Sequence, residues 1–105
     1  MKELTNETFN TFINKNENLI LVDFWAPWCG PCTIQKEILE ALERDNKSNT
    51  LFTSVNVDYE RDIVDQFKIY SIPGIYLFKN GEILYKSEGK IKNESVLKDL
   101  IKDYS

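Results

Sequence analysis

The chain has 105 residues, of which 42% are hydrophobic and 29% are charged, and its formal net charge is −4 with a pI of about 4.8. This length predicts a single domain over residues 1–105 of ordinary globular composition. The acidic balance argues against a nucleic-acid partner, which would favour a basic face. No apolar signal segment and no membrane-spanning run is visible in the sequence, so we expect a cytoplasmic protein that has no membrane contact.

The first part of the chain predicts strands separated by a helix. A very short strand is expected at 2–4. Apolar residues then recur at helical spacing between 9 and 13, in a helix that Thr5 or Asn6 opens. After a polar turn, residues 19–26 form a nearly continuous apolar run. Such a run is typical of a strand that is covered on both faces of its sheet.

Residues 28–32 read Trp-Cys-Gly-Pro-Cys and contain the only two cysteines of the chain. They lie between the 19–26 strand and a long helix that we expect at 32–45. A Cys-x-x-Cys pair at a strand-to-helix junction indicates a redox site. Residues three apart in a helix have Cβ atoms roughly 5–6 Å apart, which a small adjustment brings to disulfide distance. The pair can therefore open and close without rearranging the fold.

The two sulfurs of this pair should not be equivalent. Cys29 is expected at the N-terminus of the helix, where unpaired backbone N–H groups and the helix dipole favour a thiolate. Cys32 lies one turn inside the helix, where the fold covers it. We therefore expect Cys29 to attack and Cys32 to resolve. Gly30 leaves room for a partner backbone, and Pro31 suits the first helical turn.

The spacing of the cysteines leaves two other uses open. A structural disulfide would close a loop of about four residues, and it would stabilise the fold by only about 2 kcal/mol. Half of a zinc site would need further Cys or His ligands. The chain has no His and no third Cys, so only a dimer that pools two pairs could complete such a site.

The rest of the chain predicts three more strands and two more helices. Pro73 comes directly before an apolar strand, a position that favours a cis peptide bond. Residues 79–82 carry the Asn-Gly signature of a type I′ hairpin turn. The other elements are a strand at 51–57, a short helix within 58–68, a return strand at 83–86 that Gly89 ends, and a last helix capped by Asn93. This order predicts an α/β fold, in which a central mixed sheet of parallel strands and a C-terminal antiparallel hairpin has helices on both faces.

Asp23 is the one charged residue inside the apolar run at 19–26. A strand covered on both faces would bury its carboxyl group. Desolvation disfavours the charged form, so we expect the pKa of Asp23 to lie above that of a solvated aspartate.

The chain resembles the thioredoxin family. The resemblance is carried, in the family's order and spacing, by residues 21–26, 28–32, 72–73 and 78–82 and by Gly89, and it covers essentially the whole chain. It implies the thioredoxin fold and the activity of a protein-disulfide reductase, which passes electrons from a thioredoxin reductase to the disulfides of target proteins. It implies no cofactor and no metal, because the electrons reside on the sulfurs. We expect the protein to act as a monomer.

The resemblance also implies roles for individual residues. Cys29 would be the exposed nucleophile and Cys32 the resolving thiol. Asp23 would lie beneath Cys32 and take its proton during the attack on the mixed disulfide. Gly30, Pro31 and Pro73 would tune the reactivity of the cysteine pair, and Pro73 would do so as a cis-proline that faces the disulfide. The uncharged surface that binds targets would comprise Trp28, Gly30, Pro31, Ile72, Gly74 and Gly89.

Three positions depart from the family's usual pattern. Ser54 stands where a Lys usually neighbours the buried Asp, Glu37 replaces a Pro that commonly kinks the long helix, and Gly74 follows the cis-proline where Thr is usual. A second function also stays open, namely a redox-inert interaction or assembly module on the same fold. Loss of one cysteine or of the 72–73 dipeptide would favour that reading, and both are present.

Overall fold

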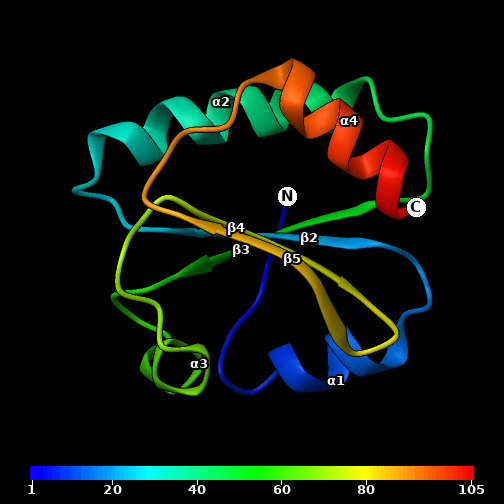
Figure 1. Ribbon diagram of the computed structural model, residues 1–105. Coiled ribbons are helices and arrows are strands. Elements are labelled where there is room, and N and C mark those ends of the chain that lie inside the picture. The colour runs from blue at the N-terminus through cyan, green and yellow to red at the C-terminus, as the bar shows by residue number, and fades with distance from the viewer.

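The computed structural model describes all 105 residues. They form a five-stranded sheet with helices on both of its faces (Figure 1). The strand order is β1-β3-β2-β4-β5, with β1, β3 and β2 parallel and with β4 antiparallel to both β2 and β5. In chain order the elements are β1 (Lys2–Glu3), α1 (Phe9–Lys15), β2 (Ile20–Trp25), α2 (Gly30–Arg44), β3 (Leu51–Asn56), α3 (Arg61–Phe67), β4 (Gly74–Lys79), β5 (Glu82–Glu88) and α4 (Glu94–Tyr104). The mixed sheet with its C-terminal hairpin is the predicted architecture.

The sheet separates two apolar cores. In Figure 1, α2 and α4 lie above the sheet and α1 and α3 lie below it. Because successive side chains of a strand point to opposite faces, β2 supplies both cores. Ile20, Val22 and Phe24 pack in the core that contains the buried residues of α1 and α3, whereas Leu21 packs in the core that contains Leu39 and Leu42 of α2 and Leu97 of α4. The predicted coverage of this strand on both faces is confirmed.

The first helix begins later than the sequence indicates. Neither Thr5 nor Asn6 caps α1, which starts at Phe9 after Thr8. The intervening residues form a turn, in which the backbone N–H of Thr5 donates to Thr8 Oγ1 at 2.9 Å and the N–H of Phe9 donates to the Thr5 carbonyl at 2.9 Å. Thr5 thus anchors the turn that leads into the helix rather than the helix itself.

The long helix begins earlier than expected, at Gly30 instead of residue 32, and runs to Arg44. Cys29 is its N-cap and Pro31 lies in its first turn, where the missing N–H needs no partner. The helix continues without interruption through Glu37, the position at which a family proline would bend it. Neither α2 nor any shorter helix has the length and apolarity that a membrane span requires.

The C-terminal hairpin has the predicted turn. Asn80 and Gly81 have φ angles of 52° and 81°, and a type I′ turn requires positive φ at both central residues. The return strand is longer than expected, because β5 stays paired with β4 from Glu82 to Glu88. The Ile72–Pro73 peptide bond, just before β4, is cis as predicted.

Asn93 caps α4, since its side chain accepts a hydrogen bond of 2.9 Å from the N–H of Val96. We expect Asn93→Ala to lower the free energy of unfolding by about 1 kcal/mol, because the N–H loses its partner. Urea unfolding would measure this loss. Ser95→Ala, an exposed position in the same helical turn, is the matched control and should change stability by less than about 0.5 kcal/mol. Equal losses in the two variants would contradict the assigned cap.

Candidate active site

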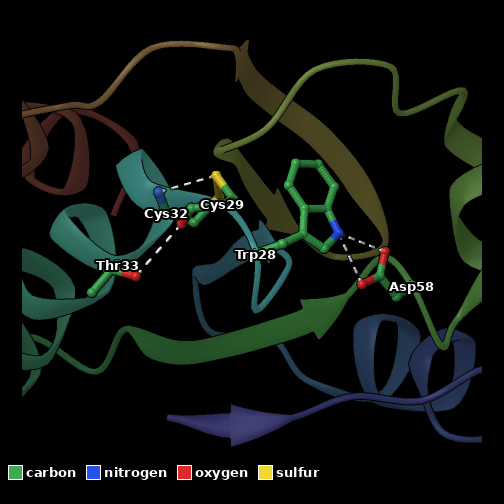
Figure 2. The surroundings of a disulfide bond; sticks show 5 residues. All are labelled: Trp28, Cys29, Cys32, Thr33 and Asp58. Atoms are coloured by element: carbon green, nitrogen blue, oxygen red, sulfur yellow. Dashed lines mark hydrogen bonds between the residues drawn. A yellow bond between two sulfur atoms is a disulfide. The ribbon is translucent and has the colours of Figure 1, made fainter.

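The two cysteines lie at the junction between β2 and α2, and they form a disulfide with Cα atoms 5.2 Å apart (Figure 2). The backbone N–H of Cys29 donates to the carbonyl of Ala26, which directly follows β2, at 3.2 Å. Cys29 Sγ accepts the N–H of Cys32 at 3.2 Å. This N–H belongs to the first turn of the helix, so the Cys29 sulfur occupies the position of an N-cap acceptor.

Solvent exposure does not separate the two cysteines. The resemblance to the family implies an exposed Cys29, but its exposed fraction is 5%, against 2% for Cys32. The prediction is wrong for the disulfide form, because both residues pack into the core beside Ala26 and Val57. What separates them is the helix start, which offers its free N–H to Cys29 alone. No group of three or more His, Cys, Asp or Glu side chains is arranged to hold a metal ion.

Trp28 projects from the protein beside the disulfide, and 71% of its surface is exposed. Its indole Nε1 donates to both carboxylate oxygens of Asp58, at 3.0 and 3.2 Å (Figure 2). Asp58 is in turn fixed by its own N–H, which donates to Asn56 Oδ1 at 2.9 Å. The exposed indole therefore has a defined orientation. Sequence reasoning missed Asp58, whose only signal is its place just after β3.

The segment after the cis bond is joined to the end of β5. The N–H of Gly89 donates to the carbonyl of Pro73 at 2.9 Å. Gly89 has a φ of +84°, and a Cβ there would lie 3.3 Å from Ser71 Cβ, so both its backbone conformation and its surroundings favour glycine. Ile72 is half-buried against the core.

The expected target-binding patch needs one correction. Gly74 is buried at the start of β4, where it pairs with Phe24, and a Cβ would lie 3.4 Å from that residue's own Cβ. It therefore presents no exposed surface. The members with exposed surface are Trp28, Gly30, Pro31 and Gly89, together with the half-buried Ile72.

Asp23 is buried in the middle of β2 with an exposed fraction of 0%, as expected. Neither carboxylate oxygen has a hydrogen-bond partner in the protein. Desolvation by burial raises the pKa of Asp23 to about 7, and the charge of Lys36 opposes that rise. Ser54, its register partner on β3, is buried and uncharged.

Lys36 is a residue that sequence reasoning missed. It lies one turn beyond Cys32 on α2, and its Nζ lies 5.1 Å from the centre of the Trp25 ring. Trp25 lies two residues beyond Asp23 on β2, and the charge of Lys36 acts on the Asp23 carboxyl group. The positive charge near the buried carboxyl thus comes from the helix, whereas the family usually supplies it from the third strand.

Residues 1–103 match the family model described as Thioredoxin. The chain is 34% identical over 102 residues to the thioredoxin of Buchnera aphidicola subsp. Baizongia pistaciae, covering 97% of this chain and 93% of that protein. It is 33% identical over 98 residues to the thioredoxin of Chlorobaculum thiosulfatiphilum, covering 93% and 91%. A solved mutant thioredoxin from Halobacterium salinarum NRC-1 has a TM-score of 0.85 at 27% identity, over 98% of this chain and 88% of that one. The chain therefore belongs to the thioredoxin family of protein-disulfide oxidoreductases.

Proposed function

We propose that this chain is a protein-disulfide reductase that works through its Cys29–Cys32 pair. The observation that carries the proposal is the disulfide at the start of α2, in a chain that matches the thioredoxin family over nearly its whole length. We infer that it acts as a single-domain monomer in the cytoplasm, where reductants keep thiols reduced and paired cysteines usually serve catalysis. Its partners are a thioredoxin reductase and target proteins that contain disulfides.

The reaction is two successive thiol–disulfide exchanges. The Cys29 thiolate attacks one sulfur of the target disulfide, and the other target sulfur leaves as a thiolate that takes up a proton. Cys32 then loses its proton and attacks Cys29 Sγ, which breaks the mixed disulfide and releases the second target thiol. The target gains two electrons, and Cys29–Cys32 becomes the disulfide. The reductase returns two electrons to this pair and restores the dithiol.

Reduced protein should be alkylated much faster at Cys29 than at Cys32 at pH 7. The N–H of Cys32 and the start of α2 stabilise a thiolate only at Cys29. The thiolate is the form that is alkylated, so we expect the rate at Cys29 to exceed that at Cys32 by about tenfold or more. Timed iodoacetamide labelling with mass spectrometry of the peptides would measure it.

Trapping variants test the same division of roles. Cys32→Ser should accumulate mixed disulfides with target proteins, and Cys29→Ser should not. Equal alkylation rates would contradict the assigned roles of the two cysteines. Complexes trapped on Cys32 instead of Cys29 would reverse them. A redox-inert module would leave target disulfides oxidised, and a metal-bridged dimer would show bound metal and the sedimentation of two chains.

We propose that Asp23 takes the proton of Cys32 when that thiol attacks. Two observations support this role: neither carboxyl oxygen is engaged in a hydrogen bond, and the pKa of about 7 suits proton exchange near neutral pH. Asp23 also shares its face of β2 with Leu21, which packs with Leu39 and Leu42 of α2, the helix that carries Cys32. This role lowers the stability of the fold, because the Asp23 carboxyl group is buried and must ionise to act.

Asp23→Asn should raise the free energy of unfolding above pH 7. Folding raises the pKa of Asp23 from its ordinary 3.8 to about 7, so the folded state holds the proton more tightly than the unfolded state. Ionisation then costs about 1.4 kcal/mol for each pH unit between the two values, or roughly 4 kcal/mol at most. The gain from Asn should grow between pH 4 and 7, and vanish below pH 4.

Urea unfolding of the disulfide form from pH 3.5 to 9 would measure this dependence. Single-turnover reduction of a disulfide substrate by the same variant should be slower at the step in which Cys32 attacks. A variant that is less stable at pH 8, or whose gain is the same at every pH, would show that Asp23 does not carry a raised pKa.

Lys36→Met should raise the pKa of Asp23 further, because the positive charge that favours its ionised form is lost. The carboxyl carbon of Asp23, followed by NMR as a function of pH, would report the change directly. Lys47→Met, an exposed loop position, is the control and should leave that titration unchanged. A lower pKa, or the same change in both variants, would remove Lys36 from the site.

A further inference from the structure

Gln35 is a buried polar residue with a single partner. It lies on α2 three residues after Cys32, and its exposed fraction is 0%. Its Nε2 donates to the carbonyl of Lys92 at 3.0 Å, and its Oε1 accepts the N–H of Lys92 at 2.6 Å. Both ends of the amide are thus satisfied by the backbone of one residue, 57 positions along the chain.

Lys92 belongs to the connection between β5 and the Asn93 cap of α4, residues 89–92, which we call the connecting segment. At its start, Gly89 donates its N–H to the carbonyl of Pro73. Just after its end, Asn93 caps α4. Gly89 and Ile91 are both exposed. The segment is therefore tied at one end to the cis-proline and, through Gln35, to the helix that carries the disulfide.

An apolar side chain could fill the volume of Gln35, but it could not fix the segment in the same way. A buried amide costs free energy unless both its donor and its acceptor are satisfied, and here a pair of opposed hydrogen bonds meets that need. Such a pair fixes both the distance and the direction of the Lys92 backbone relative to α2. Replacing Gln35 with Leu would leave the N–H and carbonyl of Lys92 without these partners.

We propose that Gln35 is a positioning residue for the binding of target proteins. It holds the connecting segment, and with it Gly89 beside Pro73, at a set distance from Cys29 and Cys32. We expect an extended polypeptide around a target disulfide to contact both the start of α2 and this segment, which Gln35 joins. A small disulfide needs only the sulfurs, so its reduction does not depend on Gln35. This inference rests on the proposed reductase function.

Pre-reduced wild type and Gln35→Leu would be mixed with two substrates, insulin and the small aromatic disulfide 5,5′-dithiobis(2-nitrobenzoate). We expect the variant to reduce insulin about fivefold more slowly or worse, as for a loss of substrate orientation, and to match wild type within about twofold on the small disulfide. Steady-state assays with a recycling dithiol should place the insulin loss in KM rather than kcat.

Asn93→Ala is the matched control, because it weakens the start of α4 just after the segment and leaves the Gln35–Lys92 pair intact. Its insulin rate should remain near that of wild type. An equal loss on both substrates for Gln35→Leu, no loss on either, or a similar insulin loss in Asn93→Ala would each overturn the inference. Failure of wild type itself to reduce either substrate would instead overturn the proposed function.

Amide hydrogen exchange in the wild-type protein tests the Gln35–Lys92 contact directly, and so does not depend on whether a variant folds. The N–H of Lys92 should be protected, whereas the N–H of the exposed Lys90 should exchange freely. Rapid exchange at Lys92 would show that Gln35 does not hold the segment, whatever the kinetics of the variants.

Discussion

The burial of β2 between two neighbouring strands and two layers of helices is the constraint on which the site depends. All residues from Ile20 to Phe24 are buried, with β3 on one side and β4 on the other. Every backbone N–H and carbonyl in such a strand needs a partner, so its register and its end are fixed together. The chain leaves the sheet at Ala26, whose carbonyl then receives the N–H of Cys29. The place of the disulfide is therefore set by the sheet.

The same burial explains why the Asp23 carboxyl group has a raised pKa and destabilises the fold when it ionises. A carboxyl group in the middle of this strand has lost its water, and β3 offers only Ser54 opposite it. Lys36 supplies a positive charge from α2 but does not cancel the desolvation, since the pKa stays well above that of a solvated aspartate. An apolar residue would suit the fold better. The proposed proton transfer gives this destabilising group a use, because a pKa of about 7 lets it exchange a proton at neutral pH.

Much of the fold could be predicted from the sequence because local patterns determine it. The apolar run at 19–26, the Asn-Gly turn and the Asn93 cap each depend on neighbouring residues, and each is present. In the fold, the expectations that are wrong concern the starts of α1 and α2 and the length of β5. In the site, they concern exposure. Cys29 is covered and Gly74 is buried because of packing against residues far away in the chain.

Three contacts of the site could not be predicted for the same reason. Trp28 with Asp58, Gln35 with Lys92, and Lys36 with Trp25 each join different elements or loops. Two of them are hydrogen bonds whose partners are 30 and 57 residues apart. No periodicity or spacing rule relates such positions, and the Lys92 partner is backbone, which carries no signature in the residue type. A buried glutamine in an otherwise apolar helix face is the only local sign.

The polar contacts around the disulfide orient surface groups, whereas apolar contacts stabilise the fold. Stability rests mainly on two apolar cores, whose largest buried members lie on β2, β4 and the inner helix faces. The contacts of Trp28, Gly89 and Gln35 are single hydrogen bonds or pairs, each of modest net energy because water competes for the same groups. They set where the exposed indole and the connecting segment lie relative to Cys29. If the protein acts as the proposed reductase, changes at these positions should alter target binding while the two cores, and the disulfide at the end of β2, stay in place.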